Sequence, residues 1–297
     1  MNKALWSGII AFSAWGLFPL YWKYFNELSG YDLFNHRLFW SFFTLGLWAV
    51  YKNKFPELYS LWKSPKKKWL VLSAFLITSN WFLYVIAITQ NKIVEASMGY
   101  FLNPLLNVLF GWLFLKETLR PGQWPSLILA MIGVGVMFTF SGLEQFPWMA
   151  IILSLTFAVY GLIRKMVHVG SLEGLTFETF IVFLPFMILW NFKSGSLIKG
   201  YETLGFYKYL ALACSGLVSS IPLALFSYAS KNLKLQTLGL TQYLSPTFKF
   251  LCGWAIFHEV IAFERWIGFI FIWSALLWYS LESVHHHRKI SMQKSLI

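Results

Sequence analysis

Long apolar runs, separated by short polar connections, are the dominant pattern of the chain. Each run holds about 20 residues, the length at which an α-helix crosses the hydrocarbon core of a bilayer. Segments such as 124–140 are apolar on every face, whereas a membrane-spanning β-strand alternates polar and apolar residues over about 10 positions. The pattern predicts an all-α integral membrane protein with ten transmembrane helices, at 4–23, 33–51, 69–89, 95–115, 123–141, 147–164, 174–192, 207–230, 236–257 and 263–282.

The composition agrees with this interpretation. Of 297 residues, 58% are hydrophobic and 12% are charged, and the mean hydropathy is +0.59. Such a chain has too little polar surface to cover a soluble globule. The first run is interpreted as a retained helix rather than a secretory signal, because Lys23 and aromatic residues follow it where a small-residue cleavage site would stand.

The formal net charge of +12 raises the question of a nucleic-acid partner. Lys and Arg, however, lie mostly in alternate connections, where they include the cluster Lys63, Lys66, Lys67 and Lys68. This positive-inside pattern places both termini in the cytoplasm. The basic residues therefore predict the orientation of the chain and a contact with membrane lipid headgroups, and they predict no nucleic-acid partner.

The chain matches itself when it is shifted by 142 residues. The shift pairs residues of identical type, such as Trp6 with Trp148, Glu117 with Glu259, and Trp124 with Trp266. It divides the chain into a first repeat at 1–142, a second repeat at 143–284 and a basic cytoplasmic tail at 285–297. Because each repeat holds five spans, an odd number, the second repeat is expected to be inverted. Inverted repeats are typical of secondary transporters, although some channels share them.

Polar residues inside the predicted spans form two stripes that the same shift relates. Their spacing of three and four residues places each stripe on one helix face, and polar groups at such depth face one another or a wet cavity. We expect the two stripes to line a central space for a substrate. The stripes are Tyr100, Asn103 and Asn107 in the fourth span, and Gln242, Ser245 and Lys249 in the ninth.

Pro104 and Pro246 lie within these two spans, and each removes a backbone hydrogen bond, which predicts a kink beside each stripe. The alternative is that the stripes only join helices and the prolines only shape the bundle. Lys249 favours a site, because a lysine at this depth must be paired, deprotonated or solvated by a cavity.

Three titratable residues are candidates for proton coupling. His36 and Glu178 are related by the shift of 142, and Glu95 stands at the start of the fourth span. A transporter that exchanges protons needs such groups. The alternative is that they are interfacial residues that pair with arginine or with a lipid headgroup. Four aromatic residues, Trp15, Trp40, Trp81 and Tyr160, are further candidates for the cavity wall, where they would stack on a solute.

Several sequence features argue against an enzyme. The chain contains no GxxxxGK[ST] phosphate loop, no HExxH and no GxSxG, and its one aspartate is Asp32. The two cysteines, Cys214 and Cys252, lie in predicted spans without a metal-ligand pattern. We therefore expect no enzymatic activity, no metal and no cofactor.

The chain resembles the RarD subgroup of EamA-type permeases, in the drug/metabolite transporter superfamily. The residues that carry the resemblance span nearly the whole chain: Trp15 to Lys23 (WGLFPLYWK), His36-Arg37 with Trp40-Ser41, Asn80-Trp81, Glu95 to Leu105 (EASMGYFLNPL), Tyr160-Gly161 with Arg164-Lys165, and Gln242-Tyr243 with Pro246. The resemblance implies ten helices in two EamA repeats, a bacterial plasma-membrane location and export of metabolites or drugs. It also carries a label that links the subgroup to chloramphenicol sensitivity.

These observations predict a secondary transporter whose partner is a small organic solute, moved by proton exchange or down its own gradient. Two alternatives stay open: a channel-like facilitator, and a membrane scaffold or regulatory protein whose polar stripes only hold helices together.

Overall fold

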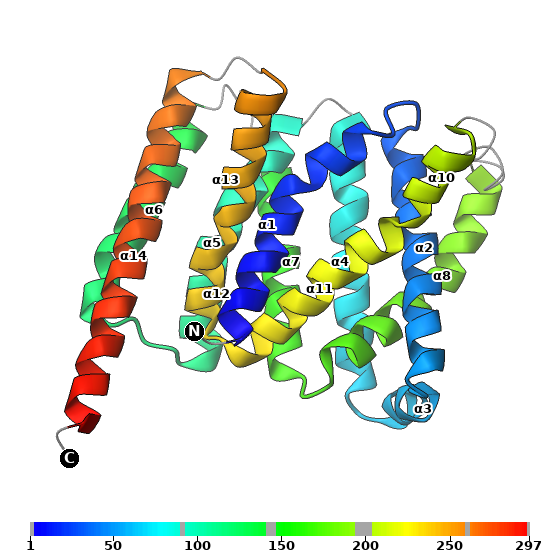
Figure 1. The fold of residues 1–297 in the computed structure, drawn as a ribbon, viewed down its shortest axis with the longest axis horizontal. Helices are drawn as coiled ribbons and strands as arrows, with labels where there is room; N and C mark the ends of the chain where they lie inside the picture. Colours follow the sequence, from blue (N-terminus) through cyan, green and yellow to red (C-terminus); the bar gives the residue numbers. More distant parts are fainter. Residues whose placement is uncertain (1–2, 90–92, 141–146, 194–203, 259–261, 296–297) are drawn as a thin grey trace.

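The computed structural model describes residues 3–89, 93–140, 147–193, 204–258 and 262–295; within its helices, the side chains of 31, 85–89, 93–98, 189–193 and 287–295 are not described. The regular elements in these ranges are all helical, as predicted (Figure 1). They are α1 (Lys3–Lys23), α2 (Gly30–Tyr51), α3 (Phe55–Lys63), α4 (Lys67–Thr89), α5 (Ile93–Leu115), a 3₁₀ turn (Pro121–Gln123), α6 (Trp124–Thr139), α7 (Trp148–Met166), α8 (Ser171–Lys193), α10 (Phe206–Ala213), α11 (Ser215–Asn232), α12 (Leu235–Gln242), α13 (Leu244–Leu251), a π-helical turn (Cys252–Ile256) and α14 (Phe263–Ser295).

Six helical segments of the described chain are long and apolar enough to cross a membrane. They are Lys3–Lys23, Pro121–Thr139, Trp148–Met166, Ser171–Ile188, Phe206–Asn232 and Phe263–His286. The remaining predicted spans coincide with α2, α4, α5 and the α12–α13 pair. The protein is therefore a multi-pass membrane protein, and the count of ten spans stays a prediction.

Two of the predicted spans are not single helices. The segment at 207–230 is divided at Cys214, and the segment at 236–257 is divided at Tyr243. Pro246 accounts for the second break, because it lacks the N–H that would bond to the carbonyl of Gln242. At the other stripe, α5 runs through Pro104 as one helix.

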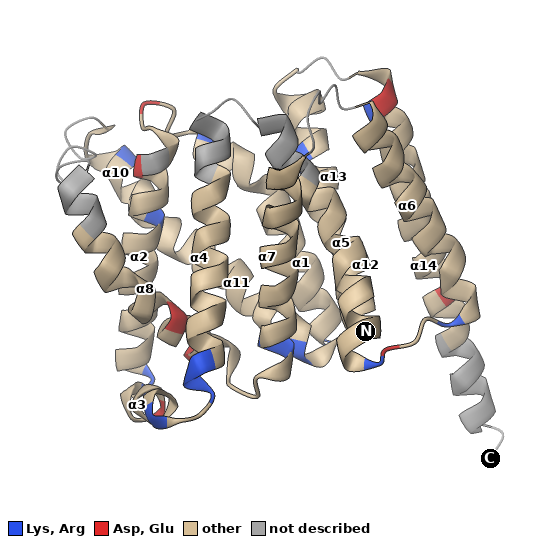
Figure 2. Cartoon of the chain, turned by 180° about the vertical axis from the view of Figure 1, so that it is seen from behind, with Lys and Arg blue, Asp and Glu red and all other residues tan. Residues whose placement is uncertain are grey.

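The short α3 is an element that the apolar pattern did not predict. Nine residues are too few to span a bilayer. Pro56 stands in its first turn, where a missing N–H costs nothing. The helix lies at the end of the bundle where α1 begins and α14 ends (Figure 1). Lys and Arg gather at this end in Figure 2, although some basic residues also lie at the other end.

Close packing between helices holds the bundle together. The helix α1 packs against α11 and α13, α7 packs against α4 and α5, and α6 pairs with α14. Gly16 shows why a small residue is needed: a Cβ there would stand 2.5 Å from the Cβ of Phe248 and 2.9 Å from the carbonyl oxygen of Ser245. Small residues that allow such close approach are typical of helix contacts in membranes.

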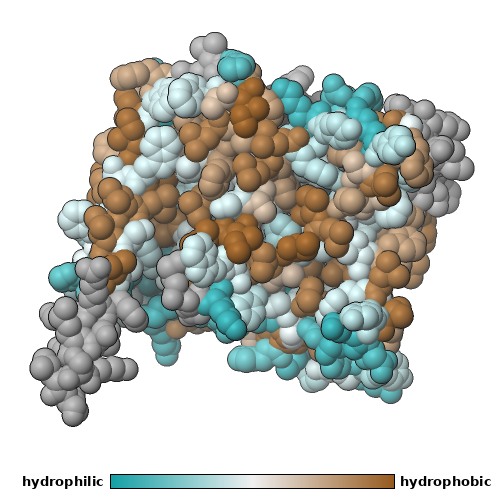
Figure 3. Space-filling model, in the orientation of Figure 1, coloured by the Kyte–Doolittle hydropathy of each residue, from teal (hydrophilic) through white to brown (hydrophobic). Residues whose placement is uncertain are grey.

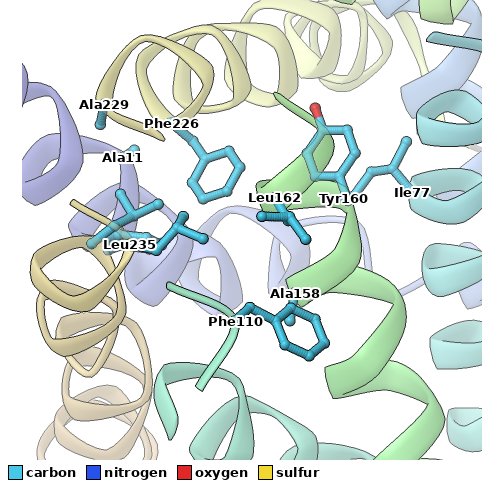
Figure 4. Close-up of a cluster of buried hydrophobic side chains, with 11 residues drawn as sticks. Ala11, Ile77, Phe110, Ala158, Tyr160, Leu162, Phe226, Ala229 and Leu235 are labelled. Carbon is cyan, nitrogen blue, oxygen red and sulfur yellow. The ribbon is translucent and has the colours of Figure 1, made fainter. Parts of the chain in front are cut away.

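The core and the surface fit a lipid environment. A cluster that includes Phe110, Tyr160, Phe226 and Leu235 joins α5, α7, α11 and α12 in the interior (Figure 4). Large apolar side chains are also exposed, as at Leu47 with 70% of its surface accessible. In Figure 3 hydrophobic colour covers the middle of the visible face and hydrophilic colour gathers toward its two ends. A surface of this kind is suited to hydrocarbon rather than water.

Candidate functional site

A cavity of about 350 Å³ lies between α1, α2, α4, α5, α7 and the α12–α13 pair. At one extreme it reaches Trp22, in the last turn of α1, and Gly30 and Leu33, in the first turn of α2. Its wall is mostly apolar and aromatic, with a few polar groups. This combination is typical of sites for small molecules.

Two cations lie in this wall, and each contacts an aromatic ring. The Lys249 Nζ lies 3.6 Å from the centre of the Tyr100 ring, and the Arg37 guanidinium carbon lies 3.9 Å from the centre of a Trp81 ring. Both side chains are partly accessible, which reflects the cavity. Attraction between a cation and the ring face stabilises each position.

The structure brings most of the two predicted stripes to the cavity. Tyr100, Asn103, Gln242, Ser245 and Lys249 all line it. The sixth stripe residue, Asn107, lies one turn farther along α5 and does not line it. Its Nδ2 instead donates a hydrogen bond of 2.8 Å to Oε1 of Gln242. The stripes therefore face a cavity over most of their length and join two helices at one point.

The four aromatic candidates divide evenly. Trp15 and Trp81 line the cavity. The Trp40 ring instead packs beside Phe39, Phe43 and Tyr209, on the side of α2 that faces α10.

Tyr160 is fully buried, and its ring stacks on Phe226 with an interplanar angle of 13° (Figure 4). Tyr160 and Trp40 thus pack against other rings in this structure and do not line this cavity.

The proton-coupling candidates do not lie together. The buried His36 has its ring edge-on to Tyr209, 5.8 Å between centroids, and is absent from the cavity wall. Glu178 lies toward the opposite end of the bundle, beside a cavity of about 20 Å³. The side chain of Glu95 lies outside the described residues.

A buried polar network surrounds Glu178. Its Oε1 lies 3.1 Å from Nη1 of Arg164 and also accepts a hydrogen bond from the Ser73 hydroxyl. Arg164 donates further to the Ser227 hydroxyl, at 2.9 Å from Nε, and to the carbonyl oxygen of Ser171, at 2.9 Å from Nη2. These contacts join α4, α7, α8 and α11 at one end of the bundle, here called the latch end.

Glu117 connects the latch end to the first residues of α12 through hydrogen bonds. Its two carboxylate oxygens accept hydrogen bonds from the backbone N–H of Leu235 and Gln236, at 3.0 and 3.2 Å. Lys165 lies 3.5 Å from the same carboxylate and donates to the carbonyl oxygen of Leu233. A carboxylate at the start of a helix satisfies N–H groups that have no partner within the helix.

Aromatic rings fill the space between the cavity and the latch end. Trp15 contacts Phe12, Phe157 and Phe226, with ring centroids 5.6 to 5.9 Å apart. Phe12 and Phe226 are fully buried. The cavity is thus bounded by rings on the side that faces the Arg164–Glu178 pair.

Several cavity residues lie outside the two polar stripes and were not predicted. Arg37, Asn80 and Tyr84 line the wall, and Nδ2 of Asn80 donates hydrogen bonds to the carbonyl oxygen of Leu153 and to Oγ1 of Thr156, at 2.6 and 2.8 Å. A signal was present, because Arg37 and Asn80 belong to the short motifs that carry the family resemblance. The described part of the chain contains no cluster of His, Cys, Asp and Glu suited to a metal.

Comparison with known proteins finds a family match in each of two parts of the chain. The EamA-like transporter family matches the chain over residues 2–139 and again over 147–281. A solved structure titled "Crystal structure of protein" superimposes with a TM-score of 0.72 at 17% identity, over 94% of this chain and 98% of its own length. At that identity the likeness shows the fold alone.

Similar sequences narrow the family further. Protein RarD of Streptomyces exfoliatus is 37% identical over 95% of this chain and 90% of its own length. Protein RarD of Salmonella typhi is 36% identical over 95% of each, and the uncharacterized transporter YojE of Bacillus subtilis is 37% identical over 94% of each. The chain therefore belongs to the RarD subgroup of the EamA-like transporter family and is a membrane transporter.

Proposed function

We propose that the protein is a secondary transporter of small organic solutes and that the cavity beside α1, α2, α5 and α13 is its solute site. The observation that carries this proposal is the difference between the two ends of the bundle. The cavity reaches the end formed by Trp22 and Gly30, whereas the latch end is closed by aromatic rings and the Arg164–Glu178 pair. A transporter that opens to one side at a time requires such a state.

The pattern of helix contacts supports two inverted repeats. When the sequence is shifted by 142, α1 corresponds to α7 and α11 corresponds to α4. The contact of α1 with α11 therefore has its counterpart in the contact of α7 with α4. The hydroxyl of Tyr243 also donates a hydrogen bond of 3.3 Å to the carbonyl oxygen of Phe101, a residue exactly one repeat earlier in the chain. Such pairing supports halves that can exchange roles.

We place the protein in a bacterial inner membrane with both termini in the cytoplasm, so that the cavity faces the outside and the latch end faces the cytoplasm. The gathering of basic residues at the α3 end supports this orientation. It also places α3 at the headgroups of the cytoplasmic leaflet, where lysines attract anionic lipid.

Topology is tested with two matched tyrosines on described connections. Tyr24, between α1 and α2, is 55% exposed, and Tyr59, on α3, is 61% exposed. After Cys214 and Cys252 are replaced by serine, Tyr24→Cys should react with an impermeant maleimide in intact cells, and Tyr59→Cys should react only after lysis. The reverse result would overturn the orientation.

For coupling, we propose Glu178 as the titrating group of a proton-exchange cycle. Its carboxylate is buried at the latch end, and opening of that end would separate it from Arg164. His36 and Glu95 remain candidates by sequence alone.

Flux in proteoliposomes tests the function. A panel of labelled solutes, including chloramphenicol, is measured with and without a proton gradient. Accumulation against a concentration gradient supports coupled transport, and equilibration alone supports a facilitator. Absence of flux for the whole panel, in protein that retains its melting temperature, would contradict transport and favour a scaffold.

A further inference from the structure

The charged groups among the described residues of the cavity wall are all of one sign. Among the described residues that line it, Arg37 and Lys249 are basic and none is Asp or Glu. They come from two different helices, Arg37 from α2 and Lys249 from α13. Removing two cations from water costs free energy that an apolar wall does not return.

Neither cation has a protein counter-ion within the described part of the chain. The ion pairs found there belong to Lys54, Arg120, Arg164, Lys165 and Lys208. Arg37 and Lys249 are placed against rings instead, and Nε of Arg37 is buried without a hydrogen-bond acceptor. An aromatic ring attracts a cation but carries no net charge, so the described part of the wall keeps a surplus of positive charge.

Arg164 shows how the same fold surrounds a cation that lies away from the cavity. Its side chain is 1% exposed, and its guanidinium contacts the Glu178 carboxylate, the Ser227 hydroxyl and the Ser171 backbone carbonyl. A buried cation in this protein can therefore be fully paired. The surplus positive charge of Arg37 and Lys249 would be neutralised by an anionic group of a bound solute.

The rest of the wall restricts what can carry that anion. Trp15, Phe34, Trp81 and Phe157 line the same space. A small inorganic anion would leave these rings without contact, whereas a hydrophobic or aromatic body would bury apolar surface against them. An organic cation would meet two like charges in a setting of low dielectric, which is repulsive.

We propose that the solute of this cavity is an organic monoanion, with a carboxylate or an equivalent acidic group held between Arg37 and Lys249 and an apolar body held by the aromatic wall. This assignment rests on the proposed function and names its substrate class. The hydroxyl of Tyr100, whose ring lies under Lys249, adds a donor for the same acidic group.

Three probes of one skeleton test the charge preference: 3-phenylpropanoate, 3-phenylpropanamide and 3-phenylpropylamine. Binding to the purified protein in detergent is measured by calorimetry, and flux of each labelled probe is measured in proteoliposomes. The carboxylate is expected to bind at least tenfold more tightly than the amide, or about 1.4 kcal/mol, and more tightly still than the amine.

Variants locate the preference. Arg37→Gln and Lys249→Gln should each weaken carboxylate binding by about tenfold and change amide binding little, because glutamine carries no positive charge to pair with the acid. Lys249→Arg should retain most of the preference. Lys68→Gln is the matched control, since Lys68 is an exposed lysine at the latch end of the bundle. If a variant fails to fold, the probe series on the unaltered protein still decides.

The two proposals fail in different ways. Selective binding of the carboxylate without flux of any probe would contradict transport and leave the anion site standing. Equal or tighter binding of the amine or the amide would overturn the anion site, whether or not the probes move across the membrane. Carboxylate preference that persists in both Gln variants would also overturn it, because another group would then hold the acid.

Discussion

The two ends of the bundle surround their buried cations differently. At the cavity end, Arg37 and Lys249 face a space of about 350 Å³ and contact rings. At the latch end, Arg164 contacts the Glu178 carboxylate, the Ser227 hydroxyl and the Ser171 carbonyl oxygen, and Glu178 lines a space of about 20 Å³. The shift of 142 relates His36 to Glu178, so the counter-ion of one half has no equivalent carboxylate in the other. The comparison teaches that the two ends of the bundle differ in how they neutralise a buried cation.

The largest effect is expected from breaking the ion pair between Arg164 and Glu178. Arg164→Gln leaves Glu178 buried without its cation, and such a loss costs about 3–5 kcal/mol of folding free energy. Chemical unfolding in detergent measures it. The double variant Arg164→Gln, Glu178→Gln should regain most of the stability, because no buried charge is then left alone. Equal stability of the single and double variants would show that the ion pair does not contribute to the free energy of unfolding.

At the cavity end, Lys249→Met should affect transport rather than folding. Methionine keeps much of the stem volume and removes the charge, so flux of a transported solute should fall by about tenfold or more, equivalent to about 1.4 kcal/mol. The melting temperature should stay close to that of the parent protein. Normal flux in the folded variant would remove Lys249 from the site and return the stripes to the role of joining helices.

Two asparagines on α5 distinguish a residue that joins helices from a residue that lines the cavity. Asn107→Ala breaks the hydrogen bond to Gln242 and should cost about 1 kcal/mol of stability. Asn103→Ala removes a side chain whose Oδ1 has no hydrogen-bond partner in the described structure, so stability should change by less than about 0.5 kcal/mol while flux falls. Unfolding and flux are measured on both. The opposite ranking would mean that the stripe residues were assigned to the wrong roles.

The smallest perturbation is a pair of cysteine replacements in a protein free of Cys214 and Cys252. Leu33→Cys lies in the cavity wall and should react with a water-soluble maleimide, and a bound solute should slow the reaction. Ile77→Cys lies in the buried cluster toward the latch end and should stay unreacted. Equal reaction at both positions would contradict a difference in access between the two ends.

The helices themselves could be predicted because runs of about 20 apolar residues are written directly in the chain. The break at Cys214 has no such signal, whereas Pro246 predicts a kink close to the break at Tyr243. Pro104 and Pro246 illustrate the difficulty. The same residue at equivalent positions leaves α5 continuous and stands just after a break between α12 and α13.

The wall of the cavity was predictable only in part. Helical spacing selected Tyr100 and Asn103 correctly as neighbours, but it could not show that the cavity ends before Asn107. His36 was chosen for its chemistry, and yet its neighbour Arg37 faces the cavity, because adjacent helix residues point about 100° apart. Which of the two faces inward depends on how α2 packs, and that is decided by the other helices.

The hydrogen bond from Tyr243 to Phe101 has a mechanical consequence. It connects a residue to its own counterpart in the other half, and so it lies close to any two-fold axis that relates the halves. Points on an axis do not move when two bodies rotate about it. If the halves rock during a transport cycle, this part-buried contact can stay intact in both states as a pivot, while the Arg164–Glu178 pair at one end and the cavity at the other move.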